Sequence, residues 1–416
     1  MLAFVVLVVA LLTALWTERI PVSAHRANAD SDGPVRRNSR QREVASMTPA
    51  HSKRTADPAL VKQWMDELLE LHPVARAEKW DVPDHENGHL AWVDFSEEIM
   101  EGVKLPDCVS EYVSNPNAEN RKCAEDWLSQ NKHIEDGLMK IAALQQRSMG
   151  DARLDGLSTP GVKNLTQAFY IPLVRGLIAA DDGDEALALS AFASAQSMVR
   201  NVDGTEATSL LGRVIANGAR TVIYERFLER VYPSVSADSE TLSAWRHTLF
   251  PGDTRDGLTR AMIGENLRCA AHLITSALSG EFDSVTDFKI TDAETKVLID
   301  AEFELKARVI AAVKSGNSLE SSPAMYGQPT DARELSEESL GFQREQMETM
   351  QSVVSAILKK ETRLMMYDAA LAAAMGEIIP ADPVSGKPFL WDGDTMTLSA
   401  PEGTSPQKPV VLPARE

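Results

Sequence analysis

The pentapeptide His85-Glu86-Asn87-Gly88-His89 has the residue types and the spacing of a zinc hydrolase motif. In that motif two imidazoles one helical turn apart bind Zn²⁺, and the glutamate between them polarises the metal-bound water. His85 and His89 would then be the metal ligands and Glu86 the catalytic residue. This chemistry requires a helix, because only on a helix do both rings point the same way.

The residues around the motif favour another local structure. Pro83 precedes the first histidine by two positions and Gly88 lies inside the motif, so both disfavour a helix through it. Asn87 is a good N-cap residue. The favoured interpretation is a boundary between a loop and a helix that starts at His89. A zinc-dependent hydrolase is the alternative, although no third ligand follows in a recognisable context.

Three aspartates near the C-terminus, Asp382, Asp392 and Asp394, could supply oxygen ligands to Ca²⁺. Asp is also common in tight turns, because its side chain accepts hydrogen bonds from the backbone two residues on. Turn formation is the favoured interpretation. The sequence contains no phosphate-binding loop, dinucleotide fingerprint or Gly-x-Ser-x-Gly elbow. No cofactor is expected, except zinc under the hydrolase alternative.

Three cysteines, Cys108, Cys123 and Cys269, occur without a Cys-x-x-Cys spacing, which excludes a zinc ribbon. In an oxidising compartment Cys108 and Cys123 could form a disulfide that closes a short loop. Three buried thiols that behave as small apolar residues are an equally good interpretation. The sequence leaves the two open.

Composition points to a large, soluble, helical region. Of the 416 residues, 44% are hydrophobic and 25% are charged, as in globular proteins, while only 6% are aromatic. Ala, Leu, Met and Glu favour helices over strands. The formal net charge of −19 would repel phosphate backbones, so nucleic acid is not an expected partner.

The N-terminal residues 1–24 begin with sixteen residues that carry no charge, which is typical of a membrane anchor or a cleaved signal peptide. Both interpretations remain open. Residues 25–56 are basic and rich in Ser, Arg and Asn, and predict a disordered tether. We therefore expect a membrane-anchored or periplasmic protein of the cell envelope, although the basic residues that follow the apolar run would favour the cytoplasm.

Apolar periodicity and capping residues predict a mostly α protein, built as an irregular antiparallel helical stack. We expect a helical subdomain over 57–148 and a helical body over 160–376. Helices are predicted at 57–71, 88–101, 105–112, 118–129, 132–147, 162–180, 184–199, 205–231, 238–249, 255–279, 292–314 and 331–375.

One pair of these helices predicts an antiparallel hairpin. The turn Asp181-Asp182-Gly183-Asp184 separates 162–180 from 184–199, and the second helix carries small alanines that permit close approach. The pair resembles a tetratricopeptide-type hairpin, but no fixed period repeats it elsewhere.

Residues 377–400 predict a β-hairpin. Asp382, Pro383, Gly386 and Pro388 prescribe turns, after which Phe389-Leu390-Trp391 and Thr395 to Leu398 flank Asp392-Gly393. A two-residue turn would place Phe389 opposite Met396, on the same side as Trp391 and Leu398. That apolar side should pack on the helical body, followed by a disordered tail over 401–416.

The segment from Thr362 to Trp391, TRLMMYDAALAAAMGEIIPADPVSGKPFLW, resembles the ending of a family of uncharacterised membrane-anchored bacterial proteins. It is more distantly similar to the C-terminal part of type II secretion pseudopilins. The resemblance implies a protein of the bacterial envelope, with Asp382, Pro383, Gly386, Pro388, Phe389 and Trp391 in structural roles. The chain departs from pseudopilins because it lacks their prepilin cleavage signature.

These features favour a non-enzymatic interaction or scaffold protein that contacts the membrane through its N-terminal segment and binds a protein partner on its helical surface. The alternatives are a zinc-dependent hydrolase that uses His85, Glu86 and His89, and a pseudopilin-like secretion assembly factor.

Overall fold

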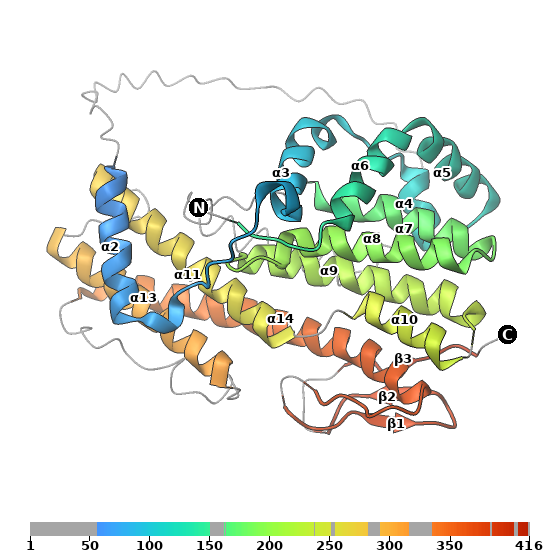
Figure 1. Cartoon of the computed structure of the whole chain (residues 1–416). Helices are drawn as coiled ribbons and strands as arrows, with labels where there is room; N and C mark the ends of the chain where they lie inside the picture. The colour runs from blue at the N-terminus through green and yellow to red at the C-terminus, as the bar shows by residue number, and fades with distance from the viewer. Residues whose placement is uncertain are drawn as a thin grey trace, which may run out of the picture.

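Helices dominate the computed structural model, as the sequence predicts, and a small antiparallel sheet lies near the C-terminus (Figure 1). The structure describes residues 56–149, 162, 164–236, 238–250, 254–281, 292–315, 335–382, 385–402 and 407–414. The α-helices are α2 (Pro58–Leu71), α3 (Gly88–Glu98), α4 (Asp107–Ser114), α5 (Ala118–Gln130), α6 (Lys132–Ala143), α7 (Leu165–Asp181), α8 (Glu185–Asp203), α9 (Leu210–Arg226), α10 (Ser239–Leu249), α11 (Thr254–Ser279), α13 (Asp292–Ser315) and α14 (Glu337–Ala374).

The predicted segments at 1–24 and 25–55 lie outside the described residues, and so does Pro383. Among the residues that are described, no helix has both the length and the apolar character that crossing a bilayer requires.

Side-chain caps explain where many of the helices begin. Asp57 accepts a hydrogen bond from the Ala59 amide at 2.9 Å, and Pro58 occupies the first helical position, as predicted. The other N-cap residues whose side chains accept a backbone amide are Asn87, Asn117, Asp184, Ser209, Asp238 and Ser336. Each cap satisfies a donor that the helix itself leaves without a partner.

Helices α7 and α8 form the predicted antiparallel hairpin. Gly183 adopts a φ of +76° in the connecting turn, where the Asp184 amide donates to the Ala179 carbonyl at 2.8 Å. A Cβ at Gly176 would lie 2.7 Å from the Phe192 ring, so glycine permits the close approach of the two helices. The prediction of a tightly packed helical pair is confirmed.

Two hydrophobic clusters divide the helices. The larger contains Trp92, Phe169, Phe192 and Trp245 and brings together α3 to α10, the C-terminal half of α14 and the sheet. The smaller contains Met65, Phe303 and Met350, from α2, α13 and the N-terminal half of α14, together with much of α11. Figure 1 shows α14 running through both parts.

This division differs from the expected subdomain over 57–148. Helix α2 packs on α11, whereas α3 packs on α6 and α8. The reason is the chain from 76 to 83, which carries no regular helix and leads from one cluster to the other. Sequence proximity therefore does not keep these helices in one unit.

The sheet consists of β1 (Leu390–Asp392), β2 (Thr397–Ser399) and β3 (Val410–Val411), in that order. Trp391 pairs with Leu398, so the predicted register with a two-residue turn is wrong. Asp392 explains the longer loop: its side chain accepts hydrogen bonds from the Asp394 amide and the Thr395 hydroxyl.

The predicted disordered tail is wrong for residues 410 and 411, which pair with β2 as a third strand. Val410 and Leu412 are buried, and the Leu412 amide donates to the Met396 carbonyl at 3.0 Å. Phe389 and Leu398 are also buried in the larger cluster. The predicted packing of an apolar sheet face on the helical body is confirmed.

We predict that Leu398→Ala destabilises the protein by about 2–4 kcal/mol, because it removes a fully buried side chain between the sheet and α14. Leu390→Ala is the matched control, since Leu390 is 49% exposed on the neighbouring strand. Urea denaturation gives both values, and limited proteolysis should cut the C-terminal region faster only in Leu398→Ala. Equal effects of the two substitutions would contradict the docking of this face.

Candidate functional site

The His85–His89 pentapeptide does not form one helix. His85 and Glu86 lie in a 3₁₀ turn (Asp84–Glu86), Asn87 caps α3, and α3 begins at Gly88. The predicted boundary is confirmed, and α3 starts at Gly88, the first residue of the helix predicted over 88–101. The His85 side chain is 80% exposed, whereas His89 is buried. The structure therefore does not bring the two imidazoles together as zinc ligands.

His89 instead forms a hydrogen bond that links α3 to α8. Its Nδ1–H donates to the Asn201 carbonyl at 2.6 Å, since a carbonyl can only accept. Burial lowers the pKa of His89 below its ordinary value of 6.5, against the opposing influence of that hydrogen bond. No group of three His, Cys, Asp or Glu residues within the described ranges is arranged to hold a metal ion.

The three aspartates considered as calcium ligands have different local interactions. Asp382 is buried and accepts from the Thr362 hydroxyl of α14 at 2.9 Å and from the Ser385 amide at 3.0 Å. Asp392 caps the loop of the hairpin, and Asp394 is exposed in that loop. The predicted turn chemistry accounts for the first two carboxylates.

The turn predicted from Asp382, Gly386 and Pro388 is present in the described residues on both sides of 383–384. Gly386 adopts a φ of +69° and its amide donates to the Asp382 carbonyl at 2.8 Å. The Asp382 amide donates to the Lys387 carbonyl, and Pro388 follows on the surface. Thr362 thereby ties this closing turn to α14.

A network of buried polar groups surrounds Asn87. Its side-chain oxygen accepts from the His89 and Ser148 amides, and its side-chain nitrogen donates to the Ser148 carbonyl at 2.8 Å. The Gly88 amide donates to the Gln146 carbonyl at 2.9 Å. The helix predicted over 132–147 ends earlier, at Ala143. These bonds explain the difference, because the segment from 144 to 149 pairs with the start of α3 and is not available to extend α6.

The loop between α8 and α9 is unusual because nearly all of it is buried and polar. Thr205, Glu206, Thr208 and Ser209 are each at most 3% exposed. Glu206 accepts from the Ser148 hydroxyl at 2.7 Å and from the Met149 amide at 3.1 Å. Glu206, Thr208 and Ser209 thus find hydrogen-bond partners inside the protein, as most buried polar groups do. The Thr205 hydroxyl is buried without a partner among the described residues.

Helix α11 covers this loop at very short range. A Cβ at Gly264 would lie 2.0 Å from the Thr208 carbonyl oxygen, so only glycine fits there. Arg268, one turn further along α11, donates to the Ala207 carbonyl at 2.7 Å. The loop is held between α11 and the segment from 144 to 149.

Asp203, at the end of α8, is the centre of a buried ion cluster. It forms ion pairs with Arg213 at 2.6 Å and with Arg220 at 2.5 Å, both from α9. Arg213 also pairs with Glu361 of α14 at 2.8 Å. Burial alone would raise the pKa of Asp203, but Arg220 and Arg213 outweigh it and hold that pKa below its ordinary value.

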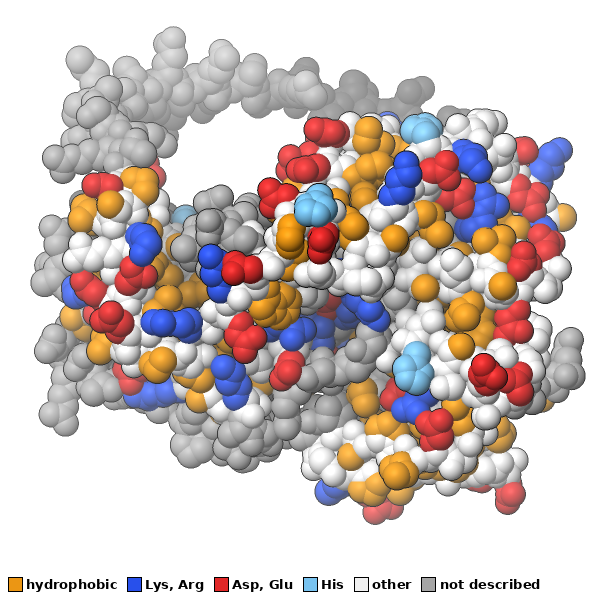
Figure 2. Space-filling view, in the orientation of Figure 1, with side chains coloured by type: hydrophobic (Ala, Val, Ile, Leu, Met, Phe, Trp, Pro, Cys, Tyr) orange, Lys and Arg blue, Asp and Glu red, His pale blue; other side chains and the backbone are white. Residues whose placement is uncertain are grey.

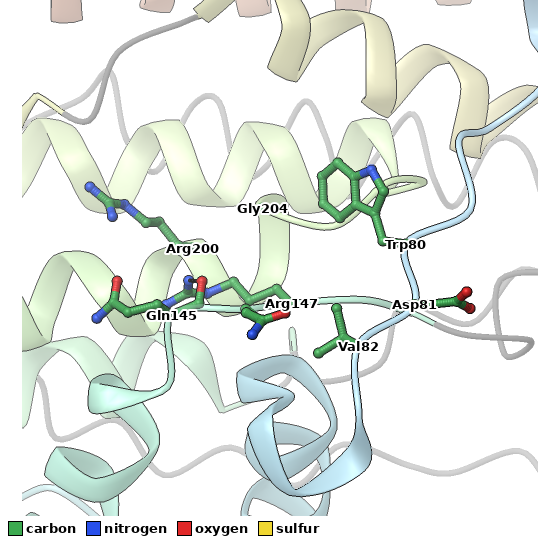
Figure 3. A pocket seen from close by; sticks show the side chains of 8 residues that line it. Trp80, Asp81, Val82, Gln145, Arg147, Arg200 and Gly204 are labelled. Atoms are coloured by element: carbon green, nitrogen blue, oxygen red, sulfur yellow. Dashed lines mark hydrogen bonds between the residues drawn. The ribbon is translucent and has the colours of Figure 1, made fainter.

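A pocket of about 360 Å³ opens beside this cluster (Figure 3). Its walls come from the chain before α3, from the segment after α6, and from the end of α8. Figure 3 shows the Arg147 and Arg200 side chains near Gln145, with the Trp80 indole at the other end. The lining residues are Trp80, Asp81, Val82, Gln145, Gln146, Arg147, Arg200 and Gly204.

None of these lining residues was a predicted site residue. Residues 145–147 were expected on a helix, and the polar stretch around Gly204 reads as an ordinary surface turn. One signal was present in the sequence: Arg213 and Arg220 lie seven residues apart, on one face of a predicted helix. Their spacing places both on one side of the helix, but it indicates neither their partner nor its burial.

We predict that His89→Ala destabilises the protein by about 1–3 kcal/mol, because the Asn201 carbonyl loses its buried donor. His85→Ala should leave stability unchanged, since that side chain is exposed. Because the pKa of His89 is lowered in the folded state, wild-type stability should also fall as the pH drops below 6.5. Urea titrations at several pH values should show a smaller loss of stability below pH 6.5 in His89→Gln than in the wild type. An equal loss in both proteins would contradict the assignment of this pH dependence to His89.

We predict that Asp203→Asn destabilises the protein by about 3–5 kcal/mol, because two buried guanidinium groups lose their shared counter-charge. The lowered pKa of Asp203 means that its contribution is complete above the ordinary value of 3.8 and is lost as the pH falls below it. Urea denaturation at neutral and acidic pH should show the difference shrinking below that value. Asp182→Asn, an exposed pair with Arg121, is the control and should change stability little.

Comparison with known proteins gives no relative from which an activity could be transferred. No family model, no curated protein and no solved structure matches the chain.

Proposed function

We propose that this chain is a membrane-anchored or exported helical protein of the cell envelope that acts as an interaction or scaffold module and binds a ligand without converting it. The observation that carries the proposal is the pocket beside the buried ion cluster, because its lining side chains are suited to recognition. Arginine, glutamine and tryptophan donate hydrogen bonds or provide an aromatic wall, as in ligand-binding sites.

The surroundings of the pocket also support binding over turnover. A general acid or base needs a titratable group within reach of the ligand. The titratable groups of the lining are Asp81, which Figure 3 shows pointing away from the arginines, and the two arginines, Arg147 and Arg200. Arginine remains protonated and serves as an electrostatic partner. These groups hold an anion more readily than they move a proton.

The proposed compartment is supported by a disulfide. Cys108 of α4 and Cys123 of α5 are bonded, with their Cα atoms 6.2 Å apart. Structural disulfides persist in oxidising compartments such as the bacterial periplasm. The apolar residues 1–16 and the resemblance of the closing segment to membrane-anchored bacterial proteins agree with an envelope location.

The proposed partners are a membrane, through the N-terminal segment, and a protein that binds the helical surface. On the face drawn in Figure 2, acidic and basic side chains are interspersed. The net charge of −19 opposes association with nucleic acid. A protein partner with a mixed or basic surface fits this charge distribution better.

We predict that Cys108 and Cys123 resist alkylation in unreduced envelope fractions and become labelled after reduction, as mass spectrometry would show. Cys108→Ala should destabilise the protein by about 3 kcal/mol, because the disulfide closes a loop with a sequence separation of 15. The free Cys269 is the control, and Cys269→Ala should leave this protection pattern unchanged. Complete labelling of Cys108 without reduction would contradict an oxidising compartment.

The binding function is tested by incubating the full chain in detergent with a library of small molecules, followed by thermal denaturation and mass spectrometry. A compound that raises the unfolding temperature and is recovered chemically unchanged supports binding without conversion. Recovery of a converted product from the wild type, but not from Arg200→Gln, would replace this function with an enzymatic one.

A further inference from the structure

The pocket concentrates positive charge that the protein itself does not neutralise. Arg147 and Arg200 both line it, and neither forms an ion pair with a described residue. Desolvation makes such an arrangement unfavourable unless another group supplies the missing negative charge. The hydrogen bonds that the two side chains already form decide which of their N–H groups remain available to a ligand.

Arg147 is held in place by neutral acceptors alone. Its Nε donates to the Asn201 side chain at 2.8 Å, one terminal nitrogen donates to the Gln145 carbonyl at 2.7 Å, and the other donates to the Ser197 hydroxyl at 2.7 Å. Burial and the nearby charge of Arg200 lower the pKa of Arg147 to about 10. The side chain is therefore fixed in orientation. Its charge is only partly offset, because Asp203, which attracts it, is already paired with Arg213 and Arg220.

The Arg200 guanidinium has fewer interactions within the protein than that of Arg147. Its Nε is buried and has no hydrogen-bond partner. Asp203 attracts it, but this carboxylate is already paired with Arg213 and Arg220. Burial and the charge of Arg220 lower the pKa of Arg200. Arg200 therefore lines the pocket with a positive charge that has no carboxylate of its own, and its side chain forms no hydrogen bond with a described residue.

The remaining walls fit a small molecule. Trp80 supplies a flat apolar surface, and the guanidinium carbon of Arg260 lies 5.8 Å from the centroid of its ring. Gln145 and Gln146 add neutral polar side chains to the lining, and the carboxylate of Asp81, which also lines the pocket, pairs with Lys79. A volume of about 360 Å³ accommodates a ligand of modest size.

We propose that this pocket binds a small-molecule oxyanion, a phosphate or carboxylate group held between the Arg147 and Arg200 guanidiniums with its organic part against Trp80. This deepens, and rests on, the binding function proposed above. Guanidinium forms charge-assisted hydrogen bonds with phosphate and carboxylate oxygens, which are stronger than bonds between neutral groups. The preorganised Arg147 lowers the cost of ordering the site.

The test uses the full chain in detergent and two probes, inorganic phosphate and succinate, titrated by calorimetry against a chloride background of constant ionic strength. Wild type should bind at least one probe. Arg200→Gln should weaken that binding at least about tenfold, because a charge-assisted contact is lost. The two probes distinguish a phosphate from a carboxylate ligand.

The control is Arg121→Gln, which removes an arginine of the same charge from a surface ion pair on α5 and should bind the probe as wild type does. Arg200→Gln should retain wild-type stability without ligand, since Arg200 forms no ion pair that folding requires. This second measurement shows that lost binding does not reflect unfolding.

Failure of both probes to bind wild type, or equal binding by Arg200→Gln, would overturn the oxyanion proposal. If the library yields an uncharged ligand that is recovered unchanged, the binding function stands and only the oxyanion class is wrong. If an oxyanion binds and is converted, the site assignment stands and the non-enzymatic function is wrong.

Discussion

The buried cluster around Asp203 is the interaction on which the arrangement of the helices depends. Asp203 ends α8, Arg213 and Arg220 belong to α9, and Glu361 belongs to α14, so one group of charges joins three helices. Removing any member would leave an uncompensated charge in a low-dielectric interior, which costs several kcal/mol. The cluster therefore favours the register of α14 against α9 in which Arg213 meets Glu361. Helix α14 contributes residues to both hydrophobic clusters and contacts the sheet.

The same end of α8 organises the pocket. Asn201, two residues before Asp203, accepts from Arg147 through its side chain and from His89 through its carbonyl. One short stretch thus positions α3, the segment after α6, and the ion cluster. Positive groups outnumber negative ones here, because Asp203 is already shared by two arginines while Arg147 and Arg200 have no carboxylate of their own. The excess charge faces the pocket, where an external anion can reach it.

The sequence predicts local structure well because local structure depends on local residues. The Asp57-Pro58 start of α2, the α7–α8 turn at Gly183 and the Asn87 boundary all follow from capping and turn chemistry. The pocket depends on contacts between distant segments: Arg147 is fixed by residues about fifty positions away, and α6 ends early because Asn87 bonds to Ser148. Glu361 lies on the helix predicted over 331–375, but its partner, Arg213, is 148 residues away in the sequence.

The charge of the whole chain and the charge of the pocket act over different distances. A net charge of −19 repels anions at long range, and ions in solution screen this repulsion beyond about 8 Å at physiological ionic strength. Arg147 and Arg200 act at contact distance in a partly desolvated site, where screening is weak and charge-assisted hydrogen bonds are strong. An anion is therefore retained only if it fits closely enough to touch both guanidiniums. The acidic surface thus opposes non-specific anion binding, and selectivity arises from the geometry that the Asp203 cluster and Asn201 impose on the two arginines.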